Sequence, residues 1–103
     1  MEININWTFT ALEDLANIHE YKAAYSKKSA NKYTDALFKY TERLKQHPEI
    51  CALCRNPTLA KRKYRCCTFK DHIIIYKYVG NVVSILSIIH ARKNPKDFAK
   101  VKG

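Results

Sequence analysis

Hydrophobic and polar residues alternate at the start of the chain and then change to a helical period. Residues 3–7 read Ile-Asn-Ile-Asn-Trp, the alternation of a half-buried strand. Thr10 and Glu13 then stand at the spacing of a capping box, which predicts a helix over residues 10–25. The apolar stripe expected for this helix consists of Leu12, Leu15, Ile18, Tyr21 and Tyr25.

A second helix is predicted over residues 29–46, where apolar residues recur at spacings of three and four. Ser26 or Ser29 can cap its start, and Pro48 ends it. The repeating positions are Ala30, Tyr33, Leu37, Tyr40 and Leu44. Because so few residues separate the two helices, we expect an antiparallel helical hairpin.

The second half of the chain has the pattern of strands. Residues 47–60 contain two prolines and no regular period, so we expect a loop there, with at most one helical turn. Gly80-Asn81 is a two-residue hairpin connection of the type that begins with glycine. The strands predicted around these signals cover residues 63–68, 72–79 and 82–90.

The turn also predicts the register of the hairpin, with Tyr76 opposite Ile85 and Ile73 opposite Ile88. Both faces of such a hairpin carry mainly apolar side chains. Two helices cover only one face of a sheet, so the second face is covered either by the chain's own loops and tail or by a partner protein. The expected fold is α+β, with a helical hairpin packed on a roughly four-stranded antiparallel sheet in the order β-α-α-β-β-β.

The composition indicates one globular domain over residues 1–103. Hydrophobic residues make up 47% of the chain, with only two glycines and three prolines, which excludes a disordered or low-complexity segment. Apart from the hairpin strands, no apolar run approaches the ~18 residues of a membrane span. The first residues lack the features of an export signal, so we expect a cytoplasmic protein.

The net charge of +10 comes from one half of the chain. Residues 1–50 contain seven Lys or Arg and seven Asp or Glu, whereas residues 51–103 contain twelve basic residues against Asp71 and Asp97. Segregation of this kind is typical of proteins that bind nucleic acid or an acidic protein. A basic surface that serves only solubility is the alternative.

The four cysteines are Cys51, Cys54, Cys66 and Cys67. Without an export signal we expect reduced thiols that are buried or half-buried. The spacing of Cys51 and Cys54 suggests a zinc site as an alternative. However, the adjacent Cys66 and Cys67 would point to opposite faces of a strand, which suits a tetrahedral site poorly. No metal and no cofactor are expected.

Two basic clusters are candidates for a functional site. The first comprises Lys61, Arg62, Lys63, Tyr64 and Arg65, where strand alternation would place Lys61, Lys63 and Arg65 on one face. The second comprises His90, Arg92 and Lys93, directly after the last strand. In an antiparallel sheet the two clusters could converge at one edge and combine cations for phosphates with His or Tyr for proton transfer.

Structural roles compete with these functional ones. Arg65 could pair with Asp14 or Glu13, and His90 at a strand end could be a structural histidine. Tyr64 could be a packing residue. Because no pair of carboxylates accompanies the clusters, a two-metal nuclease is not expected.

The order and spacing of these motifs resemble the RelE/ParE superfamily of bacterial type II toxins. Residues 5–15 (INWTFTALEDL) resemble the first strand and first helix of that family. Tyr64-Arg65 is similar to the Tyr-Arg pair of its central strand, and residues 85–92 (ILSIIHAR) resemble its last strand, which ends in His-x-Arg. The resemblance covers residues 3–98.

The resemblance implies a toxin that arrests growth, stabilises plasmids and is neutralised by an acidic antitoxin. A homodimer or a heterotetramer with the antitoxin is compatible with it. ParE-like members poison DNA gyrase through protein contacts, and we place the chain with these. RelE-like members are the alternative, and they cleave mRNA on the ribosome without metal. A non-toxic RNA-binding module is an alternative from another class.

The resemblance also implies roles for individual residues. If the protein is an mRNA endoribonuclease, the candidate catalytic residues are Arg65, Arg92 and His90. Binding of nucleic acid or a partner is expected at Lys61, Arg62, Lys63, Tyr64 and Lys93. Phe98 occupies the position where RelE-like enzymes carry an important tyrosine, and a phenyl ring cannot transfer a proton. This departure favours the ParE-like activity over the RelE-like one.

Overall fold

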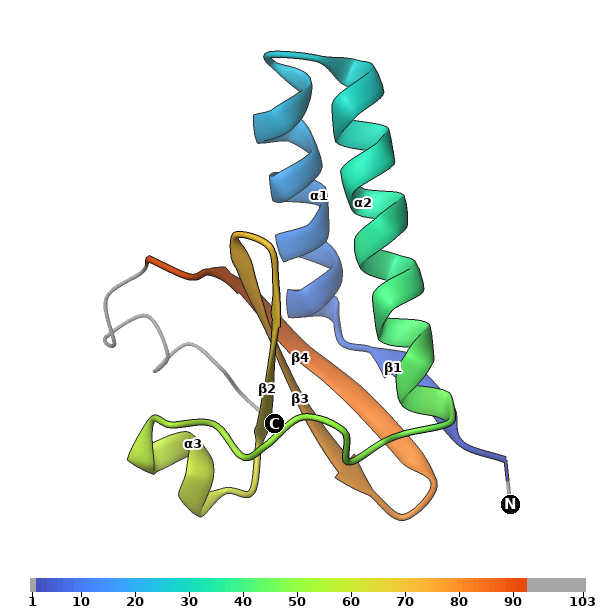
Figure 1. Ribbon diagram of the computed structural model, residues 1–103, viewed down its shortest axis with the longest axis vertical. Helices are drawn as coiled ribbons and strands as arrows, with labels where there is room; N and C mark the ends of the chain where they lie inside the picture. Colours follow the sequence, from blue (N-terminus) through green and yellow to red (C-terminus); the bar gives the residue numbers. More distant parts are fainter. Residues whose placement is uncertain (1, 93–103) are drawn as a thin grey trace.

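Two long helices stand as an antiparallel hairpin on one side of a four-stranded sheet (Figure 1). The computed structural model describes residues 2–92. The elements are β1 (Asn4–Trp7), α1 (Phe9–Ala23), α2 (Lys27–Glu42), the 3₁₀ turn η1 (Arg43–Lys45), α3 (Pro57–Lys61), β2 (Arg65–Phe69), β3 (His72–Val79) and β4 (Val82–His90). The predicted α+β fold is confirmed. Within the described residues, no helix is long and apolar enough to cross a membrane.

The cap of α1 is Thr8, two residues before the predicted Thr10. The Thr8 hydroxyl accepts a hydrogen bond of 3.2 Å from the Ala11 amide and donates one of 2.8 Å to the Ile85 carbonyl in β4. One side chain therefore both starts the helix and fixes it to the sheet. The predicted capping box is wrong because this contact with a distant strand leaves no signal in the local sequence.

The buried face of α1 also differs from the predicted stripe. Ala11 is fully buried, and Leu15 and Ile18 pack against the same core, at the i, i+4, i+7 spacing of one helix face. Three residues of the predicted stripe are exposed, namely Leu12, Tyr21 and Tyr25. The helix is apolar on several sides, so its sequence pattern does not identify the face that meets the core.

The prediction for α2 is largely confirmed. Ser26 caps the helix by accepting a hydrogen bond of 3.2 Å from the Ser29 amide. Ala30, Tyr33 and Leu37 are buried as expected, and Tyr40 packs against the core from a half-buried position. The α-helix ends at Glu42 and continues as η1, whose Leu44 completes the buried stripe.

The sheet has the strand order β1-β4-β3-β2. The pairs β2–β3 and β3–β4 are antiparallel, but β1 lies parallel to β4 with Ile5 opposite Val83. The expectation of a wholly antiparallel sheet is therefore wrong for this edge strand. A four-residue alternating pattern predicts a strand but not its direction, which depends on how the helical hairpin carries the chain away from β1.

The hairpin of β3 and β4 begins in the predicted register and then changes it. Gly80 has a φ of 62° in the turn, and Tyr76 lies opposite Ile85 as expected. A β-bulge between Ile75 and Tyr76 then shifts the pairing, so that Ile73 lies opposite Ile89 and not Ile88. As a result Ile88 faces the helices and Ile89 faces the opposite side.

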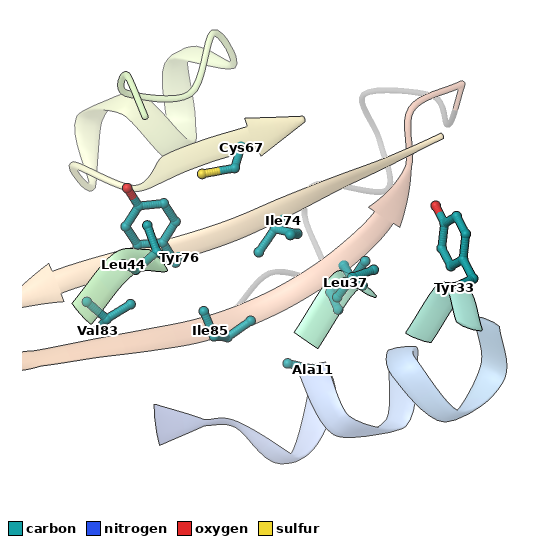
Figure 2. Close-up of a cluster of buried hydrophobic side chains, with 10 residues drawn as sticks. Ala11, Tyr33, Leu37, Leu44, Cys67, Ile74, Tyr76, Val83 and Ile85 are labelled. Carbon is teal, nitrogen blue, oxygen red and sulfur yellow. The ribbon is translucent and has the colours of Figure 1, made fainter. Parts of the chain in front are cut away.

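The side chains form a separate apolar core on each face of the sheet. The first core lies between the helices and the sheet (Figure 2), and its buried members are Ala11, Tyr33, Leu37, Leu44, Cys67, Ile74, Tyr76, Val83, Ile85 and Ile88. The second core is on the opposite face, and its buried members are Cys54, Leu59, Tyr64, Ile75, Leu86 and Ile89. The chain's own loop and α3 therefore contribute to covering the second face, which is not a bare apolar patch.

The helical turn expected somewhere within residues 47–60 is α3. Asn56 caps it by accepting hydrogen bonds from the amides of Thr58 (2.9 Å) and Leu59 (3.3 Å), and Pro57 takes the first helical position. The helix ends at Lys61, and Lys63 adopts a left-handed φ of 63°. The predicted strand over residues 63–68 consequently begins only at Arg65, because the helix and its terminating turn occupy the preceding residues.

Candidate functional site

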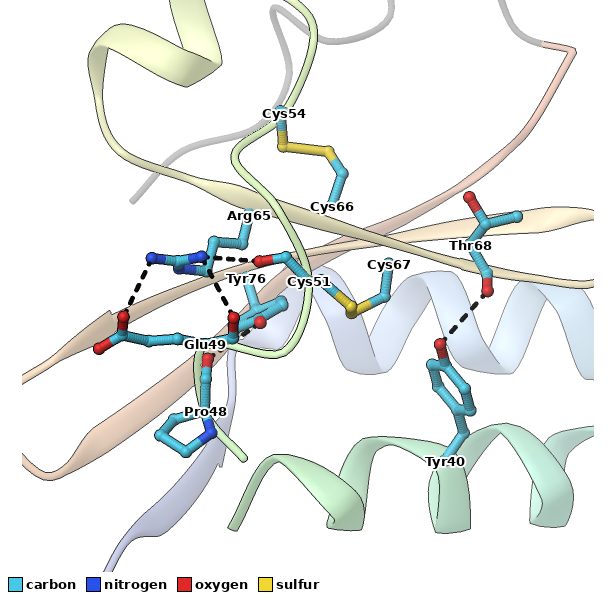
Figure 3. Close-up of a disulfide and its surroundings, with 10 residues drawn as sticks. All are labelled: Tyr40, Pro48, Glu49, Cys51, Cys54, Arg65, Cys66, Cys67, Thr68 and Tyr76. Atoms are coloured by element: carbon cyan, nitrogen blue, oxygen red, sulfur yellow. Dashed lines mark hydrogen bonds and ion pairs between the residues drawn. A yellow bond between two sulfur atoms is a disulfide. The ribbon is translucent and has the colours of Figure 1, made fainter. Parts of the chain in front are cut away.

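Arg65 is bound to the chain's own loop. Its guanidinium donates a hydrogen bond of 2.7 Å to the carbonyl of Cys51 and lies 3.5 Å from the carboxylate of Glu49 (Figure 3). The expected pairing with Asp14 or Glu13 is not observed. Instead, Asp14 accepts hydrogen bonds from the Ser87 hydroxyl and the Ile88 amide in β4. The Arg65 side chain therefore helps to hold the loop at Glu49 and Cys51 against β2.

Tyr76 reinforces the same loop from the first core. It is fully buried, and its hydroxyl donates a hydrogen bond of 2.9 Å to the carbonyl of Pro48. Burial raises the pKa of Tyr76 above its ordinary value, so the hydroxyl stays protonated and remains a donor. Together, Arg65 and Tyr76 satisfy the carbonyl groups of Cys51 and Pro48, at two points along the loop.

The four cysteines are paired as two disulfides, and the expectation of reduced thiols is wrong. Cys51 is bonded to Cys67 and Cys54 to Cys66 (Figure 3). The adjacent Cys66 and Cys67 do point to opposite faces of β2, as the sequence indicated. For that reason each meets a different cysteine of the loop, and the four sulfur atoms cannot surround one metal ion. Within residues 2–92, no three His, Cys, Asp or Glu side chains gather to hold a metal.

The first basic cluster is not a strand. Lys61 ends α3, while Arg62 and Lys63 form the turn that follows, and all three are exposed. Tyr64 is buried in the second core with an exposure of 5%, and its role as a packing residue agrees with that position. The cationic side chains of this cluster are therefore presented at the surface by α3 and its terminating turn.

A polar cluster that sequence reasoning missed lies at the other end of β2. The hydroxyl of Tyr33 shares a hydrogen bond of 2.6 Å with Nδ1 of His72, which is buried. The ammonium groups of Lys22 and Lys70 lie 4.0 Å and 5.5 Å from the centre of the Tyr33 ring. The ring of His90 packs edge-on against that of His72. These residues come from α1, α2 and three parts of the sheet, so no local motif reveals them.

The surroundings of His72 favour its neutral form. Burial lowers the pKa of His72 below its ordinary value, and His90 and Lys22 lower it further, whereas the carboxylate of Asp71 opposes them. Burial also favours the neutral form of Tyr33, whose pKa it raises above the ordinary value. A pocket of about 530 Å³ borders this cluster, with His72, His90 and Lys22 in its wall.

The two basic clusters do not converge. Both β2 and β4 are antiparallel to β3, so they run parallel to each other and the start of one is distant from the end of the other. His90 is aligned through His72 with Phe69, the last residue of β2, whereas Arg65 is the first. The length of β2 therefore separates Arg65 from His90 and Arg92.

His90 has a local structural contact at the end of β4. Its Nδ1 accepts a hydrogen bond of 3.1 Å from the amide of Arg92, and both residues are exposed. Two residues named from the sequence, Lys93 and Phe98, lie outside the described part of the chain. The described site consequently consists of two separate cationic surfaces, one at α3 and one at the end of β4.

Comparison with known proteins gives one family and one fold. The family model described as the ParE toxin of the type II toxin-antitoxin system parDE matches residues 5–95. A solved structure of the chromosomal ParDE toxin-antitoxin system from P. aeruginosa has a TM-score of 0.73, with 19% sequence identity over 85% of this chain and 95% of that one. This likeness shows that the two chains share a fold. No curated protein sequence matches the chain.

Proposed function

This chain belongs to the family of ParE toxins of type II toxin-antitoxin systems, and we propose that it arrests growth by poisoning DNA gyrase. The match of that family over residues 5–95 is the observation that carries the proposal. As a member of the family it is the toxin of a pair, and its partner is an antitoxin. The proposal locates it in the bacterial cytoplasm, where gyrase acts, and attributes the effect to protein contacts.

The geometry of the candidate catalytic residues supports contacts over RNA cleavage. A metal-independent endoribonuclease needs several cations within reach of one phosphate, where they stabilise the charge that develops during attack. Here Arg65 is bound to the loop carbonyls, and the length of β2 separates it from Arg92. The family match likewise does not favour the ribonuclease or an RNA-binding module.

For the antitoxin we propose an acidic segment that contacts the surface of α3. Lys61 and Lys63 are exposed there, and they belong to the half of the chain, residues 51–103, in which twelve basic residues stand against two acidic ones. Acidic side chains on the antitoxin would complement this field and increase the rate of encounter. The double substitution Lys61→Glu with Lys63→Glu should weaken the complex, whereas Lys39→Glu on the exposed side of α2 should have a smaller effect.

A paired assay tests the target. The purified toxin is added to gyrase with relaxed plasmid and, separately, to a coupled translation extract. Supercoiling should be inhibited while translation continues, and equimolar antitoxin should restore supercoiling. Leu37→Asp, which places a charge in the first core, provides a matched protein without the native fold. Cleaved message on the ribosomes with normal supercoiling would refute gyrase as the target.

A further inference from the structure

The loop between η1 and α3 is fastened to the sheet by both disulfides. The two bonds are nested, because Cys54–Cys66 spans 12 residues inside the 16-residue span of Cys51–Cys67. Backbone hydrogen bonds run beside them, from the Cys54 amide to the Tyr64 carbonyl (2.9 Å) and from the Cys66 amide to the Ala52 carbonyl (3.2 Å). The loop thus lies along the outer edge of β2 as an additional, irregular strand.

The surroundings of the two disulfides differ. Each bond joins a buried cysteine to a half-buried one, but on opposite faces of the sheet. Cys67 is 2% exposed in the first core, against which the half-buried Cys51 packs, and Cys54 is 4% exposed in the second core. Cys54 and Cys66 instead line a pocket of about 710 Å³ on the other face, and Cys66 is only half-buried. The pocket therefore gives a small thiol a path to the Cys54–Cys66 bond, whereas the Cys67 sulfur of the other bond is covered by the first core.

The pocket also contains a cation. The exposed side chain of Arg55 lines the same pocket as Cys54 and Cys66. A positive charge near a disulfide attracts the attacking thiolate and stabilises the thiolate that leaves. Arg55 therefore favours thiolate attack on the Cys54–Cys66 bond. The cation beside the other disulfide, Arg65 at 2.7 Å from the Cys51 carbonyl, is partly neutralised by the Glu49 carboxylate at 3.5 Å.

We propose that the Cys54–Cys66 disulfide is a redox lock that holds residues 48–64 against the second core. In the oxidised protein the lock is closed, and Cys54, Leu59 and Tyr64 cover Ile75 and Leu86 on that face. When a dithiol reductant opens it, the cover is held covalently only by Cys51–Cys67 at one end, and elsewhere by hydrogen bonds and by the packing of Leu59 and Tyr64. The segment then opens and exposes apolar surface of the sheet, while the helical hairpin stays folded.

The dithiol supplies the electrons and protons that reduction of the Cys54–Cys66 disulfide requires. One of its thiolates attacks the half-buried sulfur of Cys66, the bond to Cys54 breaks, and the Cys54 thiolate takes up a proton. The second thiol of the reductant then displaces Cys66, which leaves as a thiol. Two electrons and two protons pass from the dithiol to the protein, and the reductant becomes a disulfide.

The test follows the order of reduction and its local effect in the full-length oxidised toxin. Samples are treated with dithiothreitol, alkylated at intervals and digested for mass spectrometry, with hydrogen exchange measured in parallel. Cys54 and Cys66 should be alkylated before Cys51 and Cys67. Amide exchange in residues 48–64 should rise by about tenfold or more, because closing a loop of this length restricts the open state strongly, and exchange in α2 should not change.

Matched variants separate the lock from general destabilisation. Cys54→Ser with Cys66→Ser should show the raised exchange without reductant, whereas Cys51→Ser with Cys67→Ser should keep its response to dithiothreitol. Arg55→Gln should slow the first alkylation, and Lys39→Gln should not. Three outcomes would each overturn the proposal. They are four free thiols in the protein before dithiothreitol is added, reduction of Cys51–Cys67 before Cys54–Cys66, and an equal rise of amide exchange in α2. These readouts are independent of gyrase.

Discussion

At the scale of single residues, Arg65 illustrates the difference between a chemical capacity and a role. Its guanidinium could bind a phosphate, and its place after Tyr64 matches a family motif, but the structure directs it to the carbonyl of Cys51. The functional role suggested for Arg65 stays a prediction, and the structural pairing considered for it, with Asp14 or Glu13, is not observed. The true partners lie 14 and 16 residues away in an irregular loop, which has no period from which contacts can be inferred.

Arg65→Ala should lower the free energy of unfolding by about 1–3 kcal/mol, because the partly buried carbonyl of Cys51 loses a charged donor. Glu49→Gln should cost less than about 0.5 kcal/mol, since the Glu49 side chain is 65% exposed and surface ion pairs contribute little. Urea unfolding of both variants under oxidising conditions measures the difference. An equal loss in the two variants would show that the ion pair, and not the carbonyl contact, holds the loop.

His72 provides a prediction about pH. Its pKa is lowered in the folded state, so the unfolded chain binds a proton more readily. The contribution of His72 to the free energy of unfolding is therefore fully present above the ordinary histidine pKa of about 6.5. This contribution decreases as the pH falls below that value. The groups facing His72 are Tyr33, His90, Lys22 and Asp71.

Replacing His72 by Gln, which keeps a polar partner for Tyr33, should reduce this decrease between pH 6.5 and 5. Thermal unfolding across that range tests the prediction. His19→Gln serves as the control, because the hydrogen bond of His19 to Asn31 lies on the exposed surface of the helical hairpin. Equal slopes in His72→Gln and the parent protein would assign the acid sensitivity to other groups.

At the scale of elements, regular patterns predicted well and irregular ones did not. The boundaries of β3 and β4 were correct because two apolar runs flank a glycine turn with a φ of 62°. The bulge at Ile75 was missed, since both faces of the hairpin are apolar and an extra residue leaves the pattern unchanged. In the same way α3 was placed only as a turn somewhere in 47–60, because five residues are too few to show a helical period.

The apolar stripe of α2 carries the clearest prediction at this scale. Leu37 is fully buried in the first core, so Leu37→Asp places an unpaired charge among apolar side chains and should unfold the domain. Lys39→Asp, two residues further along the same helix, is exposed and should change the melting temperature by only a few degrees. Circular dichroism during heating distinguishes the two. Cooperative melting of Leu37→Asp near the parent temperature would contradict this assignment of the core.

At the scale of the whole molecule, the charge asymmetry has a kinetic consequence. With a net charge of +10, the toxin should attract an acidic antitoxin over distances comparable to the Debye length. The association rate constant should fall by roughly tenfold or more between 50 mM and 500 mM salt, while the dissociation rate changes less. Stopped-flow fluorescence with the Trp7 signal or surface plasmon resonance measures both. A salt-independent association rate would exclude electrostatic steering.

The disulfides show where whole-molecule reasoning from the sequence failed. The expectation of free thiols came from the expected compartment of the protein and not from the geometry of the cysteines. The opposite orientations of Cys66 and Cys67 were inferred correctly and counted only against a metal site. The position of the loop decides the pairing, because it passes the edge of β2 and brings Cys51 and Cys54 to opposite faces.

The parallel pairing of β1 with β4 determines when the nascent chain can complete its sheet during synthesis on the ribosome. Residues 4–7 have no neighbour in the sheet until residues 82–90 have been made, so the first strand synthesised waits for the last. At typical bacterial rates of translation, ~5–20 residues per second, this interval is roughly 4 to 17 s. Until then the helical hairpin lacks Val83, Ile85 and Ile88 of β4, which form part of the first core, so a product truncated before β4 cannot complete the fold. The complete sheet, and any activity that depends on it, can therefore form only when synthesis of the chain is nearly finished.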